Sequence, residues 1–256
     1  MISEKDKDAI ISQIEMIWGS RPIFYLKFCE KEDYAEDVVA GLLYANDPEY
    51  YRKKEIETGI KGQGDKNEAT LSLDITKLQA FDINTGELVF SNSGGTYHIR
   101  DKHDDNIPLV SFVGLPIRSL QLISASNGRI EFKLPFSEKE FDEMKDTFGN
   151  YCVIICAKEL ENKISERYAG LGVQYLFDQV KYVTNNYLEQ IKSYQNSSLE
   201  HLMFKDEYFS YQREYRLAMG LEMPEDHYIR IAKLDKAKIY DSGRLSDLVL
   251  AFEAKA

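Results

Sequence analysis

Gln212 and Glu214 are the residues whose types and spacing most strongly suggest chemistry in this 256-residue chain. The alternating, aromatic-rich stretch around them, residues 208–216, predicts a strand. Residues two apart on a strand share a face, so Gln212, Glu214 and Arg216 would form one polar row. Such a row is unusual in a core and fits the lining of a cleft. The structural alternative is that Glu214 is a carboxylate paired with Arg213 or Arg216.

A second cluster of polar side chains lies in residues 97–105. Two histidines, His98 and His103, stand there with three aspartates and could ligate a divalent cation, which would suggest a metal-dependent phosphoesterase. Basic residues are mixed into the stretch, however, and no predicted scaffold brings the two histidines together. A solvated polar loop is therefore the favoured interpretation, and we expect no metal.

The third feature is a glycine-rich stretch, residues 58–68. Three glycines among polar residues predict a loop with freedom to move. The stretch lacks the order of Gly, Lys and Ser or Thr that a phosphate-binding loop needs. An ordinary surface loop is favoured, and a lid or partner-binding segment is the functional alternative.

The remaining patterns predict the elements that must position these residues. The expected helices cover residues 3–18, 32–40, 48–57, 137–148, 158–168, 185–204 and 245–252. The expected strands cover residues 23–29, 42–45, 151–157, 208–219, 228–234 and 237–240, with a strand or a helix at 173–183. Residues 69–134 predict an antiparallel meander, because turn signals separate their short alternating runs. We expect one α+β domain over residues 1–256, with a mostly antiparallel mixed sheet, flanking helices and an amphipathic N-terminal helix at 3–18.

Composition and charge exclude several classes of protein. The formal charge of −11 disfavours sequence-blind binding to nucleic acid or anionic lipid. The longest apolar run, residues 152–157, is too short to cross a bilayer, so no membrane association is expected. Three cysteines and the absence of a signal peptide predict a reducing, cytoplasmic location. Seventeen tyrosines favour substantial sheet.

Two segments carry a resemblance to ADP-ribosyltransferase-like folds. The order of a strand with Tyr25 and Lys27, a short helix, and a glycine-led strand ending at Tyr44 resembles the first strand–helix–strand of those folds. The Gln212-x-Glu214 pair is similar to the Gln/Glu-x-Glu pair that some of those enzymes use.

This resemblance implies roles for individual residues and NAD as the cofactor. Glu214 would be the catalytic carboxylate that stabilises an oxocarbenium-like state, and Gln212 would orient the acceptor. The resemblance also implies that four residues bind NAD. Tyr44 would stack on nicotinamide. Tyr25 or Lys27 would occupy the position at which the family uses Arg or His to hold the adenine-side ribose. Basic residues at strand ends, such as Arg216, would attract the phosphates.

The whole chain also resembles a group of uncharacterised bacterial and phage proteins. Their ends carry a Gly-x-Leu-Tyr element and a Phe-x-Tyr-Gln/Glu-x-Glu-Tyr/Trp-Arg element, found here at residues 41–44 and 209–216. Two hypotheses follow. The first is an ADP-ribosyltransferase-like or NAD-cleaving enzyme of bacterial or phage conflict, with a macromolecular acceptor. The second is a non-catalytic acidic interaction protein of defence or counter-defence, which binds a basic macromolecular partner.

Overall fold

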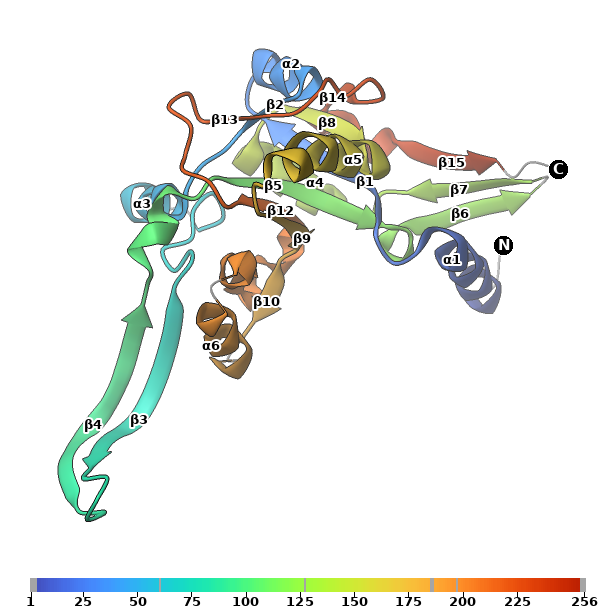
Figure 1. The fold of residues 1–256 in the computed structure, drawn as a ribbon. Helices are drawn as coiled ribbons and strands as arrows, with labels where there is room; N and C mark the ends of the chain where they lie inside the picture. Colours follow the sequence, from blue (N-terminus) through green and yellow to red (C-terminus); the bar gives the residue numbers. More distant parts are fainter. Residues whose placement is uncertain (1–3, 60, 127, 185–186, 197, 254–256) are drawn as a thin grey trace.

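A six-stranded antiparallel sheet lies at the centre of the protein, as the computed structural model in Figure 1 shows. The structure describes residues 4–59, 61–126, 128–184, 187–196 and 198–253. Across the sheet the strands are β14 (Lys238–Asp241), β8 (Tyr151–Cys156), β1 (Pro22–Cys29), β5 (Leu109–Pro116), β12 (Glu214–Met219) and β9 (Tyr175–Gln179). Every neighbouring pair in this sheet is antiparallel, which confirms the expected α+β class with mostly antiparallel sheets.

Helices pack on both faces of the central sheet, and smaller sheets lie beside it. The α-helices are α1 (Glu4–Trp18), α2 (Glu32–Ala40), α3 (Pro48–Thr58), α4 (Glu138–Phe148), α5 (Ala157–Tyr168) and α6 (Tyr187–Gln195). The short 3₁₀ helices are η1 (Lys102–Asn106), η2 (Ile117–Ser119), η3 (Ala169–Leu171), η4 (Leu199–Met203), η5 (Glu207–Gln212) and η6 (Ser242–Asp247). The small sheets are β15 (Val249–Glu253) with β7 (Arg129–Lys133) and β6 (Gln121–Ser126), β3 (Leu71–Phe81) with β4 (Leu88–Ile99), β2 (Leu42–Tyr44) with β13 (Tyr228–Arg230), and β10 (Lys181–Val183) with β11 (Phe204–Asp206).

Successive side chains of β1 point to opposite faces of the sheet and so belong to two separate apolar cores. Tyr25 packs in the core that α2 and α5 close, and Leu26 packs in the core on the opposite face with residues of α1, α4 and β7. A Ser followed three residues later by Glu, as at Ser137 and Glu140, predicts a capping box, and α4 starts with one: the two side chains bind each other's backbone N–H groups. No helix of the described chain is long and apolar enough to cross a membrane.

Several predicted elements differ from the structure. Residues 69–134 do not form one meander, because β5 joins the central sheet while β3–β4 and β6–β7 form hairpins in other sheets. Residues 245–252 are not a helix, since η6 gives way to β15, which pairs with β7. Strand β12 begins only at Glu214 and not at residue 208. Parts of four predicted segments, at residues 3, 60, 127, 185–186 and 197, lie outside the described residues.

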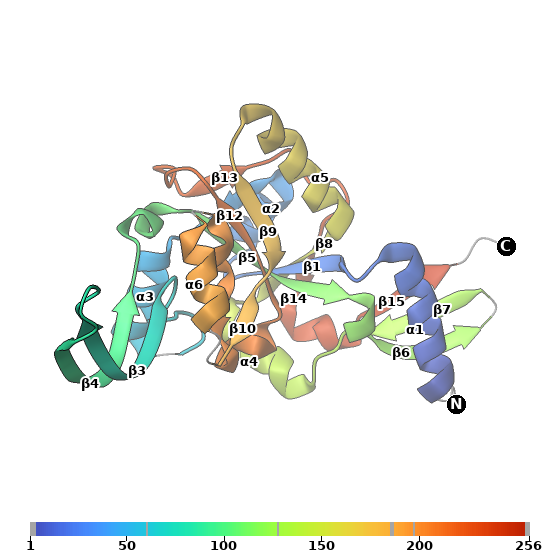
Figure 2. The ribbon, with the colours of Figure 1, turned by 60° about the horizontal axis from the view of Figure 1, so that its bottom comes forward.

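The β3–β4 hairpin extends away from the rest of the molecule. Figures 1 and 2 show it reaching outward at the end opposite to α1 and both chain termini. Its strands pair from Leu71 opposite Ile99 to Phe81 opposite Leu88. We call residues 71–99 the arm.

The front strand–helix–strand segment closes on Gly41, as the sequence predicts. Gly41 follows α2 with φ 88° and ψ 18°, a left-handed conformation that favours glycine. A Cβ at this position would lie 2.5 Å from the carbonyl oxygen of Ile231 and 2.8 Å from that of Ala232. The glycine therefore permits both the turn and the close approach of the chain after β13.

We expect Gly41→Ala to lower the free energy of unfolding by about 2–5 kcal/mol, because a left-handed conformation and a backbone clash both oppose the methyl group. Gly172 is the matched control, since it has φ +67° and no atom within 4 Å of a Cβ. Gly172→Ala should cost only about 1–2 kcal/mol. Urea unfolding measures both values, and equal costs would show that the contact with residues 231–232 is not tight.

Candidate functional site

A cavity of about 710 Å³ opens where β1 and β5 separate. The two strands pair from Pro22 to Leu26, and beyond Leu26 strand β1 continues its pairing only with β8. Residues of α3, of the loop 61–68 and of the C-terminal end of α4 complete the walls. The volume is within the range of small-molecule sites, which is about 300–1,000 Å³.

Lys27 stands at the point where the strands separate. Its Nζ donates a hydrogen bond of 2.9 Å to the carbonyl oxygen of Ser111 on β5 and lies 5.5 Å from the centre of the Phe112 ring. Burial lowers the pKa of Lys27. An ammonium group has three hydrogens, so Lys27 has further capacity to donate into the cavity.

Glu214 opens β12 and presents an ionised carboxylate to the cavity. Its Oε1 accepts from Ser111 Oγ at 2.6 Å and from Arg216 Nε at 2.9 Å, and its Oε2 accepts from Lys205 Nζ at 2.7 Å. Burial by itself would raise the pKa of Glu214, but the positive charges of Arg216 and Lys205 hold that pKa well below its usual range. The carboxylate therefore stays charged at any physiological pH.

Arg216 lies behind the cavity wall and joins two carboxylates. Its guanidinium binds both oxygens of Glu68, at 2.6 and 3.2 Å, in addition to Glu214. It also donates to the carbonyl oxygen of Leu202. Arg216 and Glu68 are each only 1% exposed. The arginine therefore fastens the end of loop 61–68 to the central sheet.

Loop 61–68 is packed against the site through several contacts. Gln212 Nε2 donates to the carbonyl oxygen of Gly62 at 3.0 Å, and Gln63 Nε2 donates to that of Thr147 at 2.6 Å. A Cβ on Gly64 would lie 2.5 Å from backbone atoms of α3, so only glycine fits this close approach.

Asp65 is a further carboxyl group in the cavity wall, which Glu30, Glu68 and Asp146 also line. It is 4% exposed, and burial together with the nearby charge of Glu68 raises the pKa of Asp65 to about 6. The cavity wall thus combines a carboxylate that stays charged, Glu214, with a carboxyl group that titrates near neutral pH, Asp65.

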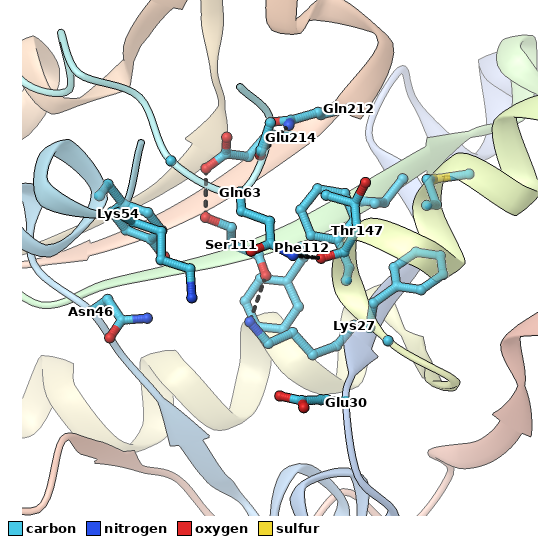
Figure 3. Close-up of a pocket in the computed structure, with 18 of the residues that line it drawn as sticks. Lys27, Glu30, Asn46, Lys54, Gln63, Ser111, Phe112, Thr147, Gln212 and Glu214 are labelled. Carbon is cyan, nitrogen blue, oxygen red and sulfur yellow. Dashed lines mark hydrogen bonds between the residues drawn. The ribbon is translucent and has the colours of Figure 1, made fainter. Parts of the chain in front are cut away.

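The opposite part of the cavity combines lysines, the Glu30 carboxylate and aromatic rings. Figure 3 shows Lys54 of α3, Lys27 of β1 and Asn46 directed toward the same space. Phe112 and the tyrosines of α3 add ring surfaces to the walls. Cations, an amide and aromatic rings around one space suit a ligand that combines anionic groups with a planar ring.

Three of the six residues singled out from the sequence meet at this cavity. Lys27, Gln212 and Glu214 line it together, and Arg216 supports it from behind. Both interpretations of Glu214 therefore describe real geometry, since the carboxylate is paired with Arg216 and also faces the cavity.

The two other predicted cofactor-binding residues lie elsewhere. Tyr25 is 2% exposed in the core, where it packs on aromatic rings of β5, β9 and β12 and donates to Glu161 at 2.9 Å. Tyr44 is 48% exposed beside His227 and Tyr228 and is not among the described residues that line the cavity.

Gln212 and Glu214 both line the cavity, but the prediction that they share one face of a strand is wrong. Gln212 ends η5 and is not on a strand. Arg213 follows in a left-handed conformation, φ 47°, and its carbonyl oxygen accepts from Gly114 N–H at 3.0 Å. This turn, rather than alternation along a strand, brings the amide and the carboxylate together.

Comparisons with protein-family models, with curated proteins and with solved structures find no match. The geometry of the cavity is therefore the basis for any functional proposal.

Sequence reasoning missed several residues of the site. Glu68 and Asp65 were not predicted as site residues, because the glycine-rich composition of residues 58–68 predicts a mobile surface loop. Both carboxyl groups are in fact buried. Ser111 and Lys205 carry no comparable local pattern, because only the sheet pairing and the chain turn at residues 204–212 bring them to Glu214.

The histidine–aspartate stretch at residues 97–105 does not converge on one point. His98 is on exposed β4 and bonds to Ser72, whereas His103 lies in η1. Within the described parts of the chain no group of three or more His, Cys, Asp or Glu residues could hold a metal ion.

Asp104 from the same stretch forms a buried contact with His201. The ring of His201 is 2.8 Å from Asp104 Oδ1 through Nε2 and 2.7 Å from the Ser198 carbonyl oxygen through Nδ1. Both partners offer acceptor oxygens, so this geometry suits the charged imidazole, in which both ring nitrogens carry hydrogen. Burial opposes this charge, but Asp104 raises the pKa of His201 above its ordinary value.

Because of the ion pair between His201 and Asp104, we expect the free energy of unfolding to fall as the pH rises. The folded-state pKa of His201 is raised, so its contribution is complete below the unfolded value of about 6.5 and disappears as pH rises through the folded-state pKa. His201→Gln should lower the free energy of unfolding by about 1–3 kcal/mol at low pH and by much less at high pH. Urea unfolding across this range measures the difference.

Asp104→Asn is the control for that experiment, because it removes the carboxylate and leaves the imidazole. It should remove the same pH-dependent contribution as His201→Gln. A pH-independent difference between wild type and both variants would contradict a charged His201.

Proposed function

We propose that the protein is an enzyme that binds an NAD-class dinucleotide in this cavity and cleaves the bond between ribose and nicotinamide. The observation that carries the proposal is Glu214, a carboxylate kept ionised by Arg216 and Lys205 at the wall of a cavity that also contains Lys27. A fixed negative charge is what a positively charged, oxocarbenium-like transition state requires.

In the proposed reaction the glycosidic C–N bond breaks and its electron pair leaves with nicotinamide, which departs as a neutral ring. Glu214 stabilises the positive charge that develops on the ribose. A water molecule or an acceptor hydroxyl then bonds to the anomeric carbon and loses its proton. Asp65 is the group we assign to accept that proton, because a carboxyl with a pKa of about 6 is ionised and basic at neutral pH.

Lys27 and Lys54 would bind the diphosphate of the dinucleotide. Their ammonium groups reach the cavity from β1 and α3, and ammonium groups bind phosphate oxygens as point charges. The nearby aromatic rings would pack against a base. These assignments move the cofactor-binding role from Tyr25 and Tyr44 to residues of the cavity. The acceptor would be water or a macromolecule.

The first test is nicotinamide release from NAD by wild-type protein and by Glu214→Gln. The variant keeps the size of the side chain and removes its charge, so we expect at least about a 100-fold loss of rate. Lys27→Met should weaken NAD binding, whereas Lys158→Met, an exposed lysine on α5, should leave rate and binding unchanged. Thermal unfolding checks that each variant is folded. Absence of both NAD binding and nicotinamide release in folded wild-type protein would contradict the proposal.

A non-catalytic acidic interaction protein is the second candidate. It is favoured by the complete pairing of Glu214, whose two oxygens already accept three hydrogen bonds from side chains, as in a purely structural ion pair. The formal charge of −11 suits a basic macromolecular partner. If wild-type protein neither binds nor cleaves NAD, this candidate becomes the favoured one.

A further inference from the structure

The arm, residues 71–99, is anchored at its base and free along most of its length. At the base, Ala69 packs in a small core with η4 residues, and its carbonyl oxygen accepts from Tyr194 Oη at 2.9 Å. Beyond Leu73 nearly every residue of β3 and β4 is partly or fully exposed. Neither strand has a second neighbour within the described chain, so both outer edges present unpaired N–H and C=O groups.

Large apolar side chains gather at the distal half of the arm. Ile83 is 96% exposed and Val89 is 71% exposed. The exposed apolar residues of this region are Leu78, Phe81, Ile83, Leu88, Val89 and Phe90. A two-stranded hairpin is at best marginally stable in water, and a clustered apolar surface marks an interaction site. The tip of the arm therefore needs a partner surface.

Charge indicates which partner fits. The arm carries four charged side chains in 29 residues, Asp74, Lys77, Asp82 and Glu87, whereas 29% of the whole chain is charged. Depletion of charge is typical of the centre of protein interfaces. Two copies of a chain with a charge of −11 repel each other, so they can approach most easily through a charge-poor segment. A basic partner would instead favour an acidic surface.

Size is consistent with the same partner. Strands β3 and β4 contribute 11 and 12 residues, and a stable interface uses about 20–30 residues on each side. A two-fold axis places a strand edge antiparallel to the same edge of a second copy, which pairs the open backbone groups of both.

We propose that the arm is a dimerisation element, which packs along the arm of a second copy of this chain about a two-fold axis. The apolar tips cover each other, and the facing strand edges join the two hairpins into one sheet. The proposal is independent of NAD cleavage, because none of the described cavity-lining residues belongs to the arm.

Analytical ultracentrifugation of the full chain over a wide concentration range tests this proposal. Wild-type protein should sediment with twice the monomer mass of 29.6 kDa. The double variant Ile83→Lys/Val89→Lys should shift the equilibrium to monomer, with at least about a 100-fold weaker association, because two cations would be buried at each tip. Both side chains are exposed, so the variant should keep the wild-type far-ultraviolet circular dichroism spectrum, which checks that the monomer is folded.

The control is Met16→Lys/Ile17→Lys, which changes two equally exposed apolar residues on α1. This variant should remain dimeric. Three results would overturn the proposal: a monomeric wild type at every concentration, a dimer that the arm variant does not weaken, or a dimer that only the α1 variant dissociates. The first would leave a different macromolecule as the partner of the arm.

Discussion

The buried guanidinium of Arg216 is the interaction on which the arrangement of the site depends. It lies at the centre of β12, where it is 1% exposed, and it joins Glu214 of the same strand to Glu68 of loop 61–68. Removing one partner of a buried ion pair costs about 3–5 kcal/mol, because it leaves an unpaired charge in the interior. Arg216 therefore keeps Glu214 charged, together with Lys205, and fixes the position of the loop that closes one side of the cavity.

The rest of the site follows from this network and from one feature of the central sheet. Strands β1 and β5 separate after Leu26, which leaves the Ser111 carbonyl for Lys27. The side chain of Ser111 then binds Glu214, so the cation on one side of the gap and the carboxylate on the other share a single residue. A charged carboxylate, a titratable one and several lysines around one cavity form an environment in which charge separation can be stabilised.

Local sequence patterns predicted the elements well where one segment determines its own structure. The helix at 32–40, the turn at Gly41 and the capping box at Ser137 all depend on neighbouring residues, and each is confirmed. The path of residues 69–134 depends on long-range pairing, and the expected single meander is wrong. The site shows the same division: Lys27, Gln212 and Glu214 were found, whereas Glu68 and Ser111 were not, because distant chain segments bring them to Arg216 and Glu214.

A double-mutant cycle on Glu68 and Arg216 tests the central role of this network most directly. The free energies of unfolding of wild type, Glu68→Gln, Arg216→Met and the double variant would be measured in urea. We predict a cost of about 3 kcal/mol or more for each single variant, and a double variant that costs little more than the larger of the two. Additive costs, with a coupling energy below about 0.5 kcal/mol, would contradict the account by showing that the ion pair does not hold loop 61–68 to the sheet.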